Sequence, residues 1–223
     1  MTHRGNPREH VFSTAEHREV YLAMLQQYAH HYKLDVWAYC LMTNHIHLIV
    51  VPGQPDSMAN AIVRAHMRYA RWYNRENGWS GHLWANRFYS TVLDEDHLWH
   101  GVRYVEANPL RARMVAQAEQ YAWSSCAAHA TLAPAHTILA PTRPFPGHIT
   151  SDQWADWINK RAPEPVEAAL RLNTSTGRPA DSPPFVQNLE AALGRLLSRQ
   201  KTGRKPKAEQ PNATPDLFDP LNA

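Results

Sequence analysis

The stretch "LMTNHIHLIVVP" at residues 41–52 decides how the first half of this chain folds. Side chains alternate along a strand, so His45 and His47 share one face while the apolar residues at 46, 48 and 50 share the other. The preceding segment "LDVWAYCLM" is rich in aromatic and branched residues, as strands are. A "TN" turn between the two segments predicts an antiparallel hairpin, which Pro52 and Gly53 end.

Helical patterns lie on both sides of this hairpin. Ser13 and Glu16 form a capping-box pattern, which predicts a helix over residues 14–32. A second amphipathic pattern predicts a helix over residues 57–77. A third helix is predicted in "DEDHLWHGVRYVEANP", because acidic residues occupy its first turn and Pro109 ends it. A strand is predicted in "FYSTVL", just before this helix. The fold class is therefore α+β, an antiparallel sheet flanked by helices.

The composition changes at about residue 130. The first 129 residues are predicted to form one catalytic domain, and residues 130–204 a proline-rich, partly irregular extension with helices in "SDQWADWINK" and "DSPPFVQNLEAALGRLL". Residues 205–223 are predicted to be a disordered tail.

The overall composition excludes few partners. The chain has 223 residues, a formal net charge of +3 and only two cysteines, and its pI is about 8.9. The charge is mildly basic, so its sign alone does not establish a nucleic-acid partner. No segment approaches the ~20 apolar residues that a membrane-spanning helix needs, and we expect a cytoplasmic protein.

Two imidazoles on one strand face can converge on one metal ion. The plainer interpretation is that His45 and His47 are partly exposed residues of a half-solvated sheet. Histidine-triad nucleotide hydrolases need a third alternating histidine, but the next position on that face is Ile49. A metal-assisted nuclease of the HUH type (histidine, hydrophobic residue, histidine) fits better, and this class needs a nucleophilic tyrosine on a nearby helix.

The segment "RYVEANPLRARMV" offers such a tyrosine. Tyr104 and Asn108 lie four residues apart and share a helix face. Asn108 offers a carbonyl oxygen as a third metal ligand. The alternative is that Tyr104 packs on the sheet and Asn108 only caps the helix.

Arginines supply the candidate DNA contacts. One helix face carries an arginine stripe at spacings of four, three and four residues, which can neutralise phosphates or simply form a solvated face. Two further arginines flank Tyr104 and are candidates for contact with the scissile strand. The predicted DNA-binding residues are Arg64, Arg68, Arg71, Arg75, Arg103 and Arg111.

Four stretches together resemble the REP-associated tyrosine transposases, relatives of the IS200-like single-tyrosine transposases: "MTNHIHLIV", "NRENGWSGHLWANRFYS", "YVEANPLRARMV" and "YAWSS". The stretches follow one another in family order, the resemblance covers residues 3 to about 129, and "GRPADSPPFVQNLE" adds a weaker match. The resemblance implies a ferredoxin-like HUH nuclease domain. It also implies that His45, His47 and Asn108 hold Mg²⁺ or Mn²⁺ and that Tyr104 attacks a DNA phosphate.

The implied activity is a transposition-type reaction: cutting and rejoining of single-stranded DNA beside a palindromic-repeat hairpin, through a 5′-phosphotyrosine, by a monomer or homodimer. Members of the family usually carry a strand just before "RGN". Because this chain begins at Met1, most of that strand is expected to be missing, which would expose a sheet edge.

Two rival functions stay open. The chain could bind hairpin nucleic acid without cutting it, and the expected loss of the first strand favours that alternative. It could also be a metal-dependent phosphohydrolase that uses activated water, with Tyr104 only structural. Replacing Tyr104 by phenylalanine separates hydrolysis from tyrosine chemistry.

Overall fold

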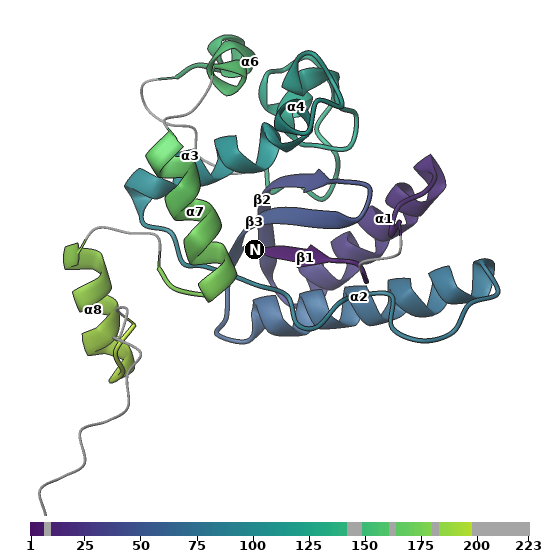
Figure 1. Ribbon diagram of the computed structural model, residues 1–223, viewed down its shortest axis with the longest axis horizontal. Coiled ribbons are helices and arrows are strands. Elements are labelled where there is room, and N and C mark those ends of the chain that lie inside the picture. Colours follow the sequence, from purple (N-terminus) through teal and green to yellow (C-terminus); the bar gives the residue numbers. More distant parts are fainter. Residues whose placement is uncertain (7–9, 142–148, 161–163, 180–182, 198–223) are drawn as a thin grey trace, which may run out of the picture.

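A computed structural model describes residues 1–6, 10–141, 149–160, 164–179 and 183–197 (Figure 1). Its sheet has three antiparallel strands, β1 (Thr2–Arg4), β2 (Leu34–Leu41) and β3 (His45–Pro52), in the order β1–β3–β2. The predicted hairpin is confirmed as β2 and β3, and β3 is the central strand.

Helices cover both faces of this sheet, as Figure 1 shows. The helices α1 (Ala15–His31) and α2 (Ser57–Glu76) pack on one face, and α3 (Glu95–Glu106) packs on the other. Along β3, Ile46 and Leu48 belong to the core under α1 and α2, whereas Ile49 belongs to the core under α3. The alternation predicted from the sequence is confirmed, and with it the α+β fold class.

The first strand is present, contrary to expectation. In β1, Thr2 pairs with His47 and Arg4 pairs with His45. The Met1 amino group donates a hydrogen bond of 2.8 Å to the Leu48 carbonyl and lengthens the contact with β3. Three residues are enough to form a strand, because the backbone hydrogen bonds between neighbouring strands form one residue pair at a time. The sheet therefore does not lack this strand.

The prediction of a strand in "FYSTVL" is wrong. This part of the chain makes isolated bridges to β1, from Trp84 to Gly5 and from Tyr89 to Thr2, without a continuous ladder. Asn86, between the two bridges, has a φ of 55°, which interrupts the extended backbone and shifts the register. The segment still lies beside β1.

Two predicted helix signals also differ from the structure. The cap of α1 is Thr14 rather than Ser13, and its hydroxyl accepts a hydrogen bond of 3.2 Å from the His17 backbone N–H. Pro109 does not close α3, which already ends at Glu106. It lies instead in the first turn of the short helix α4 (Asn108–Arg111), where a missing N–H costs nothing.

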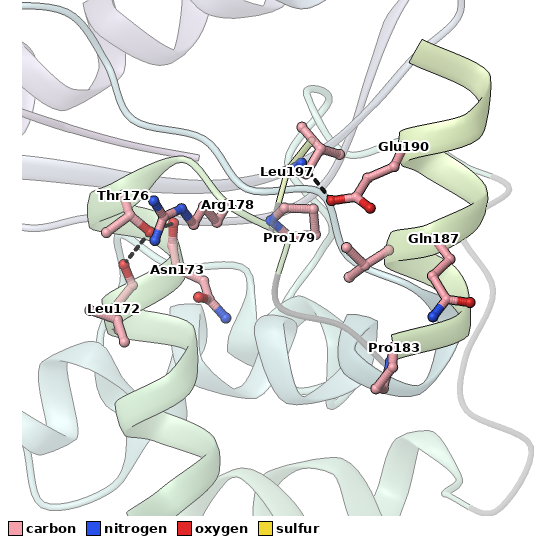
Figure 2. Close-up of a pocket in the computed structure, with 10 residues that line it drawn as sticks. Leu172, Asn173, Thr176, Arg178, Pro179, Pro183, Gln187, Glu190 and Leu197 are labelled. Atoms are coloured by element: carbon pink, nitrogen blue, oxygen red, sulfur yellow. Dashed lines mark hydrogen bonds between the residues drawn. The ribbon is translucent and has the colours of Figure 1, made fainter. Parts of the chain in front are cut away.

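The C-terminal part is helical. It contains η1 (Ala118–Gln120), α5 (Cys126–His129), α6 (Ser151–Asn159), α7 (Glu164–Thr176) and α8 (Pro183–Leu193). The predictions of α6 and α8 are confirmed, whereas α7 was not predicted. A hollow of about 620 Å³ lies between α7 and α8 (Figure 2). The predicted disordered tail lies outside the described residues.

A polar cluster is buried between the sheet and α2. The Tyr21 hydroxyl lies 2.9 Å from His66 Nε2, and His66 Nδ1 lies 2.8 Å from His3 Nδ1. These contacts suit a neutral His66 that accepts from Tyr21 and donates to His3. Burial, followed by the neighbouring His3, holds the pKa of His66 well below 6.5.

We expect this cluster to make stability fall in acid. The unfolded chain has a histidine pKa of about 6.5, so it binds protons before folded His66 does as the pH drops. Stability is then lost below about pH 6.5, by up to ~1.4 kcal/mol per pH unit for each such histidine. Urea unfolding at pH 7.5 and 5.5 checks this. His66→Gln should show a smaller pH dependence than the wild type, and parallel losses in both proteins would contradict the assignment.

Candidate functional site

The two predicted metal ligands lie side by side on β3. The ring centroids of His45 and His47 are 4.9 Å apart, and the rings are nearly perpendicular at 84°. Burial, with a smaller contribution from Arg4, lowers the pKa of His45 to about 4. Burial and the nearby His45 hold the pKa of His47 well below 6.5. Both imidazoles are therefore neutral at pH 7, the state in which a ring nitrogen can bind a metal.

Asn44 sets which nitrogen of His45 is available. Its side-chain oxygen lies 2.7 Å from His45 Nδ1. A carboxamide oxygen only accepts, so Nδ1 carries the proton and Nε2 keeps its lone pair. Contacts of this kind hold metal-binding histidines in one tautomer.

Helix α3 brings Tyr104 to these histidines. Its ring centroid is 5.8 Å from that of His47, at 85°. Gly101 lies at this contact, where a Cβ would lie 3.4 Å from Ile49 Cδ1 and 2.7 Å from Leu93 Cδ1, the end of a flexible side chain. Glycine at this position lets the helix lie close to the sheet. The sequence prediction that Tyr104 meets the histidine face agrees with this placement.

Arg111 ties Tyr104 to Asn108. Its guanidinium carbon lies 4.2 Å from the centroid of the Tyr104 ring. The same guanidinium donates hydrogen bonds of 2.8 Å to the Tyr104 carbonyl and to Asn108 Oδ1. The Asn108 amide group donates to the carbonyls of Tyr104 and Val105 at 3.1 and 3.3 Å. Asn108 thus closes the end of α3, and its oxygen is engaged by Arg111.

The predicted DNA-binding arginines do not form one surface. The stripe of Arg64, Arg68, Arg71 and Arg75 is exposed on α2, on the sheet face opposite α3. Arg111 lies beside Tyr104. Arg103 is 7% exposed, and its guanidinium carbon lies 5.0 Å from the ring centroid of Trp157. The structure therefore brings Arg111 to the site, separates the stripe from it, and buries Arg103.

Two charged residues near the site were missed from the sequence. Arg4 pairs with His45 across the sheet and shares its face. Glu167 of α7 lies 3.8 Å from Arg111. The register of β1 would have identified Arg4 had the strand been expected. No local pattern connects Glu167 with Arg111, because α7 itself was not predicted.

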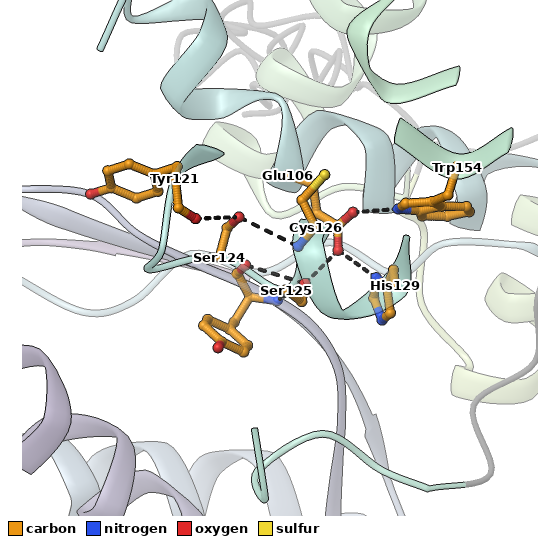
Figure 3. Close-up of polar contacts among 8 residues, drawn as sticks. Glu106, Tyr121, Ser124, Ser125, Cys126, His129 and Trp154 are labelled. Atoms are coloured by element: carbon orange, nitrogen blue, oxygen red, sulfur yellow. Dashed lines mark hydrogen bonds and ion pairs between the residues drawn. The ribbon is translucent and has the colours of Figure 1, made fainter. Parts of the chain in front are cut away.

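A buried carboxylate anchors the end of α3 (Figure 3). Glu106 is 0% exposed and accepts hydrogen bonds from Trp154 Nε1 at 2.8 Å, from His129 Nδ1 at 2.5 Å and from the Ser125 hydroxyl. These partners come from α5, α6 and the residue before α5. The contacts fix the helix that carries Tyr104 to the C-terminal part of the chain.

Comparisons with known proteins give one matching family and one similar solved structure. Residues 2–108 match the family of IS200-like transposases. This part of the chain is therefore similar to a transposase domain. A solved structure of a REP-associated tyrosine transposase bound to a REP hairpin is 16% identical, with a TM-score of 0.49 over 65% of this chain and 90% of that one. No protein of curated function matches.

Two features are absent from the part of the chain that the structure describes. None of its helices is long and apolar enough to cross a membrane. It holds no group of three or more His, Cys, Asp and Glu side chains placed to bind one metal ion.

Proposed function

We propose that this chain is a metal-assisted endonuclease and strand transferase that cuts single-stranded DNA beside a palindromic-repeat hairpin, with Tyr104 as its nucleophile. One observation carries the proposal. The ring centroids of Tyr104 and His47 are 5.8 Å apart, and the neutral imidazole of His45 lies next to that of His47. A tyrosine beside two free imidazole lone pairs suits metal-assisted phosphoryl transfer.

The donor set fits a divalent ion such as Mg²⁺ or Mn²⁺. His45 and His47 would hold it, and Asn108 Oδ1, which accepts one hydrogen bond from Arg111, would have its second lone pair for the ion. Water and a DNA phosphate oxygen suit the other positions of such an ion. When bound, the metal would supply Lewis-acid polarisation and orientation of the phosphate.

The chain's own residues carry the remaining steps. The Tyr104 oxygen attacks the phosphorus and loses its proton, forming a new phosphorus–oxygen bond. The 3′ oxygen of the neighbouring nucleotide leaves and takes up a proton, which gives a 5′-phosphotyrosine and a free 3′-hydroxyl. Arg111, stacked on the ring, holds the phenol in place and stabilises negative charge that develops on it. Attack by a 3′-hydroxyl on the phosphotyrosine then rejoins DNA without ATP.

The test is formation of a covalent adduct. The full chain is incubated with a single strand that carries a palindromic-repeat hairpin and its flanks, with Mn²⁺ or with EDTA, and run on a denaturing gel. We expect a protein–DNA adduct with Mn²⁺ only, and peptide mapping should place the nucleotide on Tyr104. Cutting without an adduct would support hydrolysis by activated water instead. Binding without cutting would support a hairpin-binding protein, an alternative that loses its main support because β1 is present.

Arg111 is expected to act as a positioning residue. Arg111→Lys keeps the charge but loses the planar stack on Tyr104 and the paired hydrogen bonds. We expect adduct formation to slow by roughly 10- to 100-fold, because a misplaced nucleophile is costly. Single-turnover rates at saturating DNA measure this. Arg113→Lys, at an exposed position nearby, is the matched control and should react like the wild type.

A further inference from the structure

Arg4 lies on the sheet face that carries the histidine pair. In the register of the sheet it stands directly opposite His45, and Thr2 stands opposite His47. Side chains of directly paired residues share one face, with Cβ atoms about 4.5–5.5 Å apart. The Arg4 side chain is exposed to solvent. Within the described part of the chain, its guanidinium forms no hydrogen bond and no ion pair. Arg4 is therefore a cation beside the histidine pair that is available to a ligand.

The charge of Arg4 reaches both imidazoles. Burial is the main cause of the lowered pKa of His45, and the charge of Arg4 adds to it. For His47, burial and the nearby His45 lower the pKa most, and Arg111 and Arg4 add smaller contributions. A phosphate held beside the two rings would therefore lie within the field of two arginines.

These two arginines approach the histidine pair from different sides. The pair lies on the central strand β3, which has β2 on one side and β1 on the other. Helix α3 packs over β2 and β3, so Tyr104 reaches His47 from the β2 side (Figure 1). Arg111 stacks on the Tyr104 ring and lies with it. Arg4 belongs to β1 and therefore lies across the histidine pair from the phenol.

The geometry of phosphoryl transfer gives this placement a meaning. The attacking and leaving oxygens lie roughly in line, on opposite sides of phosphorus. A phosphate bound at the histidine pair and attacked by Tyr104 would present its leaving 3′ oxygen toward β1. The bond from the phenol oxygen to phosphorus forms while the bond to the 3′ oxygen breaks. The electron pair of the broken bond stays on the 3′ oxygen until a proton from water joins it.

We infer that Arg4 is a catalytic residue for the leaving group, and that its guanidinium donates to the 3′ oxygen as the bond to phosphorus breaks. This inference rests on the proposed function, because it assumes that Tyr104 is the nucleophile. A fixed cation at an oxygen that becomes negative only in the transition state lowers the barrier. Arginine suits this role because it is permanently charged and donates from a rigid planar fork. The same contact holds the 3′-hydroxyl when it attacks the phosphotyrosine in the reverse step.

The experiment replaces the leaving oxygen by sulfur. Two hairpin strands are compared, one with the natural 3′ oxygen at the cut and one with a 3′ sulfur at the same position. A thiol is far more acidic than an alcohol, so its anion leaves without help from a cation. Adduct formation at saturating DNA is timed in Mn²⁺ for the full-length wild type, Arg4→Ala and Arg195→Ala. Arg195 is exposed and lies in the segment after α8, outside the sheet, so its substitution removes the same charge elsewhere.

The ratio of the two strands gives the answer. Arg4→Ala should slow adduct formation on the natural strand by roughly 100-fold, as the loss of one transition-state donor does. On the sulfur strand it should react within about 3-fold of the wild type, which also shows that the variant is folded. Arg195→Ala should match the wild type on both strands.

Two results would overturn the inference. Arg4→Ala could slow both strands equally, which would mean that the arginine acts on something other than the leaving oxygen, or it could slow neither. In both cases the wild type still forms the adduct, so the proposed cleavage stands and only the role of Arg4 fails. A wild type that forms no adduct on either strand would instead defeat the proposed cleavage, and the role of Arg4 with it.

Discussion

Tyr104→Phe is expected to abolish the covalent protein–DNA adduct while leaving DNA binding intact. The substitution removes only the hydroxyl, and the ring can still stack under Arg111 and face His47. Because the hydroxyl oxygen is the atom that bonds to phosphorus in the proposed reaction, the rate of cleavage should fall by roughly 10³-fold or more. Single-turnover cleavage and equilibrium binding to the same hairpin strand separate the two effects.

The matched control for this prediction is Tyr89→Phe. Tyr89 is 47% exposed and meets β1 only through backbone bonds that the substitution keeps. The control should form the adduct at the wild-type rate. If Tyr104→Phe still cuts DNA at a rate near that of the wild type, the nucleophile is water and the tyrosine is structural.

Local periodicity explains which parts of this molecule were predictable. A period of two placed His45 and His47 on one face and Ile46 on the other, and the structure has them there. A period of 3.6 predicted α1, α2 and α3 to within a few residues. These signals are repeated over many residues, so one unusual side chain does not change them.

The errors arose where a single residue or a distant partner decides the structure. Asn86, two residues before "FYSTVL", has a positive φ that separates the bridge at Trp84 from the bridge at Tyr89, and the pattern within "FYSTVL" cannot reveal it. The hydrogen-bond partners of Glu106 lie 19 to 48 residues away along the chain, too far for any local pattern to connect them. Asn108 could be predicted to share a face with Tyr104, but its bond to Arg111 could not, because it depends on how α4 turns after α3.

Among contacts between residues far apart in the sequence, the hydrogen bonds of Glu106 should contribute most to stability. Its carboxylate is 0% exposed, and Ser125, His129 and Trp154 all donate to it (Figure 3). Glu106→Gln keeps the size of the side chain but replaces one accepting oxygen with an amide that donates. A donor then faces donors inside the core. Disrupting a buried charged group in this way costs ~3–5 kcal/mol, a large part of the ~5–15 kcal/mol that stabilises a typical domain.

Urea unfolding followed by tryptophan fluorescence measures that loss, and Glu119→Gln is its control. Glu119 accepts a hydrogen bond of 2.8 Å from Asn159 at the contact between η1 and α6, but it is partly exposed to water. The control should lose less than ~1 kcal/mol, since water can replace the lost partner. Because Glu106 lies two residues after Tyr104, its substitution should also slow adduct formation in the fraction that stays folded. Equal stability of the two variants would mean that the end of α3 is held by packing alone.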